Sequence, residues 1–152
     1  MTSWTDVDLA EPEFATAVRD RFLVRKHATM ATISRDGSPR ISGTEVDFAE
    51  DGEIYLGMMA GARRAADLRR DGRVAIHCPT EDPPPDNPNG WPGEAKISAY
   101  ATELVDPLSG TRSHRFRLDI RRVVLTTIAS TGDELEITVW GPGRALEVIR
   151  RR

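Results

Sequence analysis

The sequence has very little cysteine: Cys78 is the only one in 152 residues. One thiol cannot form an intramolecular disulfide or supply the paired thiolates of a structural zinc site. Histidine is also scarce, and His27, His77 and His114 are far apart in the chain. No HExxH, CxxC or GxSxG string is present. These absences argue against a disulfide scaffold, a metal site and a hydrolase with a nucleophilic triad.

Long hydrophobic runs are missing too. No apolar stretch reaches the ~18 residues that indicate a transmembrane helix. The acidic segment MTSWTDVDLAEPEF lacks the basic and apolar regions of a secretory signal. Because a single cysteine also suits a reducing compartment, we expect a cytoplasmic protein with no membrane partner.

Positive charge is not in excess, since 21 Lys and Arg stand against 24 Asp and Glu for a formal net charge of −3. A general nucleic-acid binder would normally carry a basic stripe, so nucleic acid is not an expected partner. The length suits one hydrophobic core, and no repeat or shift in composition marks a boundary. We therefore expect a single domain over residues 1–152, with residues 1–10 as a flexible N-terminal segment.

Most of the chain has the pattern of short strands separated by turn residues. The Asp-Gly and Ser-Pro pairs within RDGSP, for example, are typical of a hairpin turn. The expected strands cover residues 27–34, 40–49, 54–59, 73–78, 95–105, 116–129 and 133–140, the expected helices cover 11–26, a short stretch from 63 and 144–150, and a proline-rich loop (79–93) and a connector (107–114) complete the chain. The helix 11–26 is amphipathic, because its apolar residues recur at helical spacing at Phe14, Val18, Phe22 and Leu23. The whole pattern predicts a mainly β fold, a six- or seven-stranded antiparallel barrel with peripheral helices.

The most informative stretch is the turn from the strand 54–59 into a helix that opens with Arg63 and Arg64. The first N–H groups of a helix lack intrahelical acceptors, and the helix dipole adds partial positive charge there. Gly57 and Gly61 leave the backbone uncrowded, and guanidinium groups match phosphate oxygens. The stretch predicts a phosphate site, although the same arginines would also suit the solvated face of an amphipathic helix.

Two further segments are candidates for contact with the flat part of a ligand. Trp140 and Arg144 flank a Gly-Pro-Gly turn, which suits either stacking on a heterocycle or a core tryptophan beside a turn. Ser42, Gly43 and Thr44 are small and polar in the middle of a strand. They suit either a ligand against the backbone or a solvated sheet face.

The order of these parts resembles the pyridoxamine 5'-phosphate oxidase-like family of FMN-binding split barrels, particularly its short members that use FMN or a deazaflavin. The resemblance covers roughly residues 12–148 and is most specific at Arg63, Arg64 and Leu68, and the segments ATISRDGSPRIS and ITVWGPGR agree with it. Ala62 stands where the family usually has serine or arginine. The fuller set of substrate-phosphate residues of true pyridoxamine phosphate oxidases is not evident either, so vitamin B6 oxidation is not indicated.

The resemblance implies a homodimer of split barrels with cofactors bound at the dimer interface. By position, Arg63 and Arg64 would hold the phosphate, and Trp140 and Arg144 would reach the cofactor from the partner subunit. The ring and ribityl chain would be lined by Ser42, Gly43, Thr44, Gly57, Met58 and Met59, with Lys96 and Trp91 as further candidates.

The function that this implies is a flavin-type oxidoreductase acting on a small organic molecule. The cofactor performs hydride transfer in such enzymes, and the step requires no acid or base from the protein, so no catalytic residue is assigned. FMN is the expected cofactor and coenzyme F420 the alternative, since both carry a phosphate and a tricyclic ring. A non-catalytic split barrel that binds or sequesters the cofactor, and a plain structural barrel, remain as other hypotheses.

Overall fold

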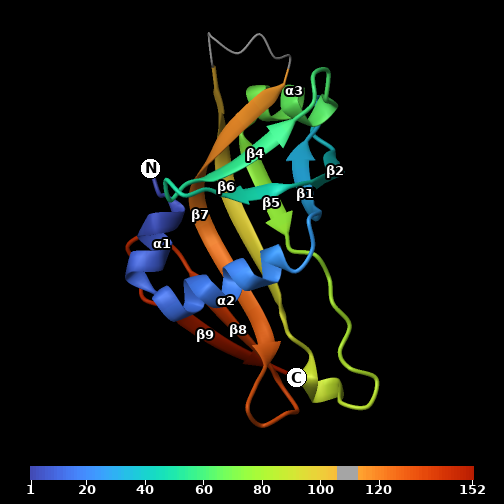
Figure 1. Ribbon diagram of the computed structural model, residues 1–152, viewed down its shortest axis with the longest axis vertical. Coiled ribbons are helices and arrows are strands. Elements are labelled where there is room, and N and C mark those ends of the chain that lie inside the picture. Colours follow the sequence, from blue (N-terminus) through green and yellow to red (C-terminus); the bar gives the residue numbers. More distant parts are fainter. Residues whose placement is uncertain (106–112) are drawn as a thin grey trace.

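The computed structural model describes residues 1–105 and 113–152. Helices pack around one antiparallel sheet, which has nine strands in these residues (Figure 1). The helices are α1 (Trp4–Ala10), α2 (Pro12–Leu23), α3 (Arg63–Arg70) and the 3-10 turn η1 (Pro88–Gly90). The strands are β1 (Ala28–Ile33), β2 (Pro39–Thr44), β3 (Val46–Phe48), β4 (Ile54–Met58), β5 (Arg73–His77), β6 (Glu94–Leu104), β7 (His114–Ile128), β8 (Leu135–Trp140) and β9 (Glu147–Arg151).

Chain connectivity curls this sheet into a barrel. The strand order is β2-β1-β5-β6-β7-β4-β3, with β8 paired to β7 and β9 to β8. The two ends of the path, β2 and β3, are separated in sequence by one residue, Glu45. One edge of β7 is divided, since residues 114–117 pair with β4 and residues 123–128 pair with β8. The expected split β-barrel fold is therefore confirmed.

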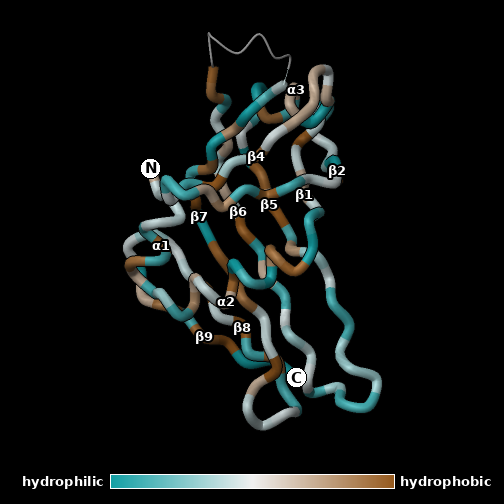
Figure 2. Tube along the Cα trace, in the orientation of Figure 1, coloured by the Kyte–Doolittle hydropathy of each residue, from teal (hydrophilic) through white to brown (hydrophobic). Residues whose placement is uncertain are grey.

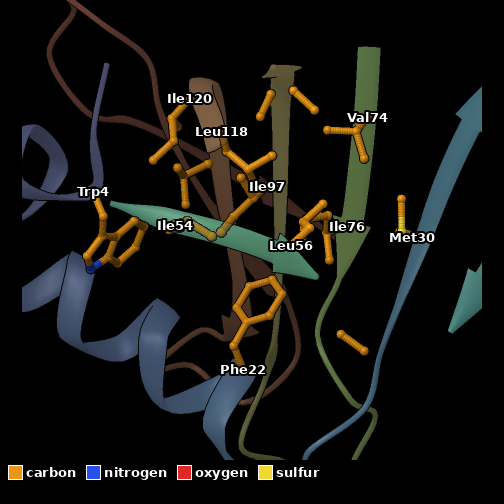
Figure 3. Close-up of a cluster of buried hydrophobic side chains, with 14 of the residues drawn as sticks. Trp4, Phe22, Met30, Ile54, Leu56, Val74, Ile76, Ile97, Leu118 and Ile120 are labelled. Atoms are coloured by element: carbon orange, nitrogen blue, oxygen red, sulfur yellow. The ribbon is translucent and has the colours of Figure 1, made fainter. Parts of the chain in front are cut away.

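The core fills the inside of the curled sheet with apolar side chains from alternating strand positions. Along β6, buried and solvent-facing residues alternate from Ala95 to Ala101, as expected for a strand with one face on the core. Figure 3 shows Leu56, Ile97 and Ile120 from three strands meeting in this interior, and all three are fully buried. Hydrophobic residues concentrate on the central strands, whereas the loop between β5 and β6 is largely hydrophilic (Figure 2).

Helix α2 confirms the amphipathic helix expected over residues 11–26, although it ends at Leu23. Phe14, Val18 and Phe22 are buried at helical spacing, as the periodicity predicts. Leu23, placed on the same stripe by the sequence, is 59% exposed. The apolar stripe is thus narrower than expected.

Helix α1 lies within the segment that was expected to be flexible. Ser3 and Asp6 form a reciprocal capping box at its start, which satisfies free N–H groups of the first turn. Trp4 and Val7 are buried, and the Trp4 ring meets Phe48 edge-on with 5.0 Å between centroids. The Ser-x-x-Asp pattern at the start of this segment is the sequence signal from which the helix could have been predicted.

The C-terminal segment, expected as a helix over residues 144–150, is strand β9. It pairs antiparallel with β8, where Ile149 lies opposite Ile137. An isolated helix of this length is marginal because nucleation is costly, whereas the β-branched Val148 and Ile149 suit a strand. The expected strand 40–49 is also divided at Glu45. These two differences raise the expected seven strands to nine within the described residues.

The proline-rich segment 79–93 is irregular apart from η1, as expected. Arg21 of α2 forms an ion pair with Glu81 at 2.8 Å, and Trp91 Nε1 donates to the Glu81 carbonyl at 3.0 Å. The loop is therefore attached to α2. The connector expected at residues 107–114 falls mainly outside the described residues. Among the described helices, none has the length and apolar character needed to cross a membrane.

Candidate functional site

A cavity of about 950 Å³, here called the main cavity, lies where the β2–β3 junction, β4, the start of β7 and the start of α3 meet. Figure 1 shows these elements in the upper half of the molecule. Six residues predicted from the sequence line it: Gly43, Thr44, Gly57, Met58, Met59 and Arg64. Residues not predicted complete the lining: His27, Glu45, Val46, Asp47, Tyr55, Ser113, His114 and Arg115. The structure thus brings together two of the predicted segments.

The turn between β4 and α3 produces one end of this cavity. Gly61 has a φ of 75°, a left-handed conformation that glycine adopts without strain. Ala62 is the N-cap of α3, and no side chain in the described part of the protein caps it. The first N–H groups of α3 are consequently left for solvent or for a ligand, and a helix start favours an anion.

Arg64 has an unsatisfied donor at this end. Its Nε is buried and has no hydrogen-bond partner among the described residues. An unpaired buried donor costs about 1–3 kcal/mol, and a phosphate oxygen would satisfy it with a charge-assisted bond. Arg63, the other member of the predicted pair, is exposed and does not line the cavity.

Asp67 holds α3 against the sheet and so fixes the position of Arg64. Its carboxylate is nearly inaccessible and accepts hydrogen bonds from Thr32 Oγ1 at 2.8 Å, Arg40 Nε at 2.7 Å and Arg70 Nη2 at 3.1 Å. Burial by itself raises the pKa of Asp67, but the bonds from Arg40, Thr32 and Arg70 outweigh it and lower the pKa from 3.8. Asp67 therefore remains ionised at neutral pH.

The backbone is open at two glycines that line the main cavity. A Cβ atom built on Gly43 or on Gly57 would meet no atom of the described chain within 4 Å. Neither glycine has the positive φ that would explain it as a turn residue. The free space above these strands is what a planar group needs in order to approach the backbone closely.

Tyr55 and Arg115 form a further wall that sequence reasoning missed. The Arg115 guanidinium lies 3.8 Å from the centroid of the Tyr55 ring, a cation–π contact. The Tyr55 hydroxyl donates to Asp51 at 2.7 Å, and this bond lowers the pKa of the Asp51 carboxyl. Tyr55 comes from β4 and Arg115 from β7, so their meeting depends on strand pairing and has no motif in the sequence.

Trp140 and Arg144 lie outside the main cavity. They line a second cavity of about 380 Å³ together with Arg121 and Arg122. Trp140 is 3% exposed and belongs to the hydrophobic core of its own chain. Within one chain, the interpretation of Trp140 as a core residue beside a turn therefore holds, and three arginines line this second cavity.

Lys96 lines a third, largely apolar cavity of about 240 Å³, which also involves Ile41. Ile41 is 75% exposed on β2. In the part of the chain that the structure describes, none of these three cavities is lined by Ser42, Arg63 or Trp91. Within one chain, the predicted cofactor residues therefore lie in several separate places.

Comparison with known proteins places the fold. No family model matches the sequence, and no curated protein matches it. PhzG from Burkholderia lata 383, solved in complex with tetrahydrophenazine-1-carboxylic acid, is similar with a TM-score of 0.63 and 13% identity over 96% of this chain and 91% of that chain. A pyridoxamine 5'-phosphate oxidase-related, FMN-binding protein from Nostoc punctiforme PCC 73102 is similar with a TM-score of 0.61 and 12% identity over 93% and 96%.

A heme-binding protein from Mycobacterium smegmatis is also similar, with a TM-score of 0.52 and 16% identity over 88% of this chain and 57% of that chain. The chain accordingly has the fold of pyridoxamine 5'-phosphate oxidase-related proteins, which the sequence resemblance predicted. The similar proteins include an FMN-binding protein and a heme-binding protein, so this fold by itself does not specify the ligand.

Proposed function

We propose that this protein, which shares its split-barrel fold with pyridoxamine 5'-phosphate oxidase-related proteins, is a flavin-type oxidoreductase that binds FMN in the main cavity. The observation that carries the proposal is Arg64, whose buried Nε lacks a partner in the described chain at the uncapped start of α3. A phosphate group would accept a hydrogen bond from this Nε and would also suit the uncapped start of the helix. The similarity to the FMN-binding protein from Nostoc supports the same cofactor.

The residues present fit FMN in charge and in shape. Arg64 and the first turn of α3 suit the phosphate, whereas Gly43 and Gly57 leave room for a flat ring along the strands. Met58 adds an apolar side chain to the lining of the cavity, and Thr44 adds a small polar one. The volume of about 950 Å³ lies in the range of roughly 300–1,000 Å³ that is usual for ligand sites.

These contacts give the cofactor and the protein separate roles. Bound FMN would supply hydride transfer to a small organic acceptor. The chain itself binds the phosphate through Arg64, orients the ring against the backbone of β2 and β4, and keeps α3 in place through Asp67. No residue of the protein is assigned an acid or base role in the hydride step.

The proposal includes a homodimer. Trp140 and Arg144 lie in a different cavity from Arg64, so the cofactor residues expected from the resemblance do not meet within one chain. A second copy is the simplest way for Trp140 and Arg144 to approach the cofactor. The third cavity beside β1, β2 and β5 offers it an apolar contact face, in which Ile41 is largely exposed.

Titration of the purified protein with FMN and, separately, with coenzyme F420 tests the proposal, with absorption and fluorescence as readouts. We expect saturable binding of FMN; saturable binding of F420 in its place would assign the alternative cofactor to the same site. Oxidation of the reduced cofactor by a quinone, an enone or oxygen distinguishes an enzyme from a sequestering protein, which would bind without turnover. Binding of neither cofactor would refute the proposal.

A further inference from the structure

His114 lines the main cavity but belongs to no sequence motif. It is the first residue of β7 and lies opposite Met58 in the β4–β7 ladder, so it adjoins a predicted cofactor residue. Its side chain is 17% exposed. A histidine at this position has contact both with the protein interior and with whatever occupies the cavity.

Glu103 and Arg69 fix the orientation of this imidazole. Glu103 Oε1 lies 2.8 Å from His114 Nδ1, and the same carboxylate accepts two bonds from Arg69, Nε to Oε2 at 2.5 Å and Nη2 to Oε1 at 2.8 Å. The bond from Arg69 lowers the pKa of Glu103, and the bond from His114 adds to this against the opposing effect of burial. Arg69 comes from α3, so the helix that carries Arg64 also holds the His114 ring in place through Glu103.

The hydrogen-bond partners of Nδ1 determine what the other ring nitrogen can do. Arg69 Nη2 is also 2.9 Å from His114 Nδ1, but a guanidinium only donates and a carboxylate only accepts. Arg69 already donates twice to Glu103, and the charge-assisted contact between Nδ1 and Glu103 is the shorter one. The shorter contact favours the tautomer with its hydrogen on Nδ1, in which Nε2 keeps a lone pair, and no residue that the structure describes bonds to this Nε2.

We propose that His114 is a positioning residue whose Nε2 accepts a hydrogen bond from a hydroxyl or N–H group of the cofactor in the main cavity. This inference rests on the proposed function. The phosphate of FMN is mostly a dianion at neutral pH, with oxygens that only accept hydrogen bonds, so it does not match an accepting Nε2. FMN carries ribityl hydroxyls and a ring N–H, which are donors. Arg64 and His114 would thus recognise groups of opposite hydrogen-bonding character, which fixes the direction in which the cofactor lies.

Long-range ¹H–¹⁵N NMR of the whole protein tests this directly, because the chain has three histidines and the His114 signals are those lost in His114→Phe. In the free protein we expect a protonated Nδ1 and an unprotonated Nε2, and FMN should shift the Nε2 resonance. Glu103→Gln should weaken the preference for this tautomer.

Affinity for FMN provides the second readout. His114→Phe should weaken FMN binding about three- to tenfold, the loss of one hydrogen bond. His114→Gln, which keeps an acceptor on a side chain of similar reach, should retain most of the affinity. A merely structural role of the ring would not produce this rescue together with a ligand-dependent Nε2 shift.

A protonated Nε2 in the free protein would overturn the inference. So would an Nε2 resonance that FMN leaves unchanged while His114→Phe binds FMN as tightly as the wild type does. If His114→Phe fails to fold, His114→Gln assigns the His114 signals by their loss, and the NMR measurement on the wild type still decides. Failure of the wild type to bind FMN or F420 would instead refute the proposed function, and it is recognised before any variant is made.

Discussion

Neighbouring arginines of α3 have very different surroundings. Arg63 is exposed outside the main cavity, whereas the next residue, Arg64, lines it and buries its Nε. Arg69 and Arg70 are engaged by Glu103 and Asp67. Successive residues of an α-helix point in directions about 100° apart, so a basic pair in the sequence does not mean two equivalent ligands. The phosphate role is therefore proposed for Arg64 above all.

Asp67 is predicted to be a major stabilising residue. Asp67→Asn removes the charge that Arg40 and Arg70 contact, and we expect a loss of about 2–4 kcal/mol in the free energy of unfolding at pH 7. The pKa of Asp67 is lower in the folded protein than its ordinary value of 3.8. Its contribution is therefore complete above that value and disappears as the pH falls through the folded-state pKa.

Urea unfolding of wild type and Asp67→Asn at pH 7, 5 and 3 measures this effect. The two proteins should differ equally at pH 7 and pH 5, and the difference should shrink at pH 3. Equal stability at pH 7, or a difference of constant size down to pH 3, would contradict the role given to the carboxylate.

At the scale of elements, the sequence predicted best where the signal is local. Turn residues such as Gly37 and Gly52, both with positive φ, separate strands that the alternation of apolar residues already indicates. The periodicity of Phe14, Val18 and Phe22 predicted α2. These features require no knowledge of distant partners, because backbone conformation and the period of the pattern suffice.

The missed elements depend on tertiary contacts. β9 is a strand because β8 is available as a partner, and α1 is held because Trp4 packs against Phe48. The same limit applies to the site. Gly57 and Arg64 lie within one predicted strand–turn–helix segment, whereas His114 and Arg115 come to lie beside it only through the pairing of β4 with β7. Sequence periodicity carries no information about that pairing.

At the scale of the whole molecule, the course of the chain around the sheet creates the main cavity. The β2–β3 junction at Glu45 brings Gly43 and Thr44 to the same region as Gly57 and Arg64. Two of the remaining candidates, Trp140 and Arg144, line a different cavity. The cofactor site proposed here is therefore complete only if two copies associate.

Association is tested at Ile41. Ile41→Lys places a charge on the exposed apolar face beside β1 and β5, and we expect a shift from dimer to monomer in sedimentation velocity together with weaker FMN binding. Leu9→Lys, a change at an equally exposed leucine of α1, serves as the control and should leave the dimer intact. A monomeric wild type, or an Ile41→Lys protein that remains dimeric, would contradict this part of the account.

The central claim is that Arg64 at the start of α3 binds the phosphate of the cofactor. Its most direct test compares the affinities of wild type, Arg64→Ala and Arg63→Ala for FMN and for riboflavin, which lacks the phosphate. Arg64→Ala should weaken FMN binding by about 1.5–3 kcal/mol, roughly tenfold to a hundredfold, with little change for riboflavin and a smaller effect at Arg63. Equal losses for the two ligands, or unchanged FMN affinity in Arg64→Ala, would contradict the claim.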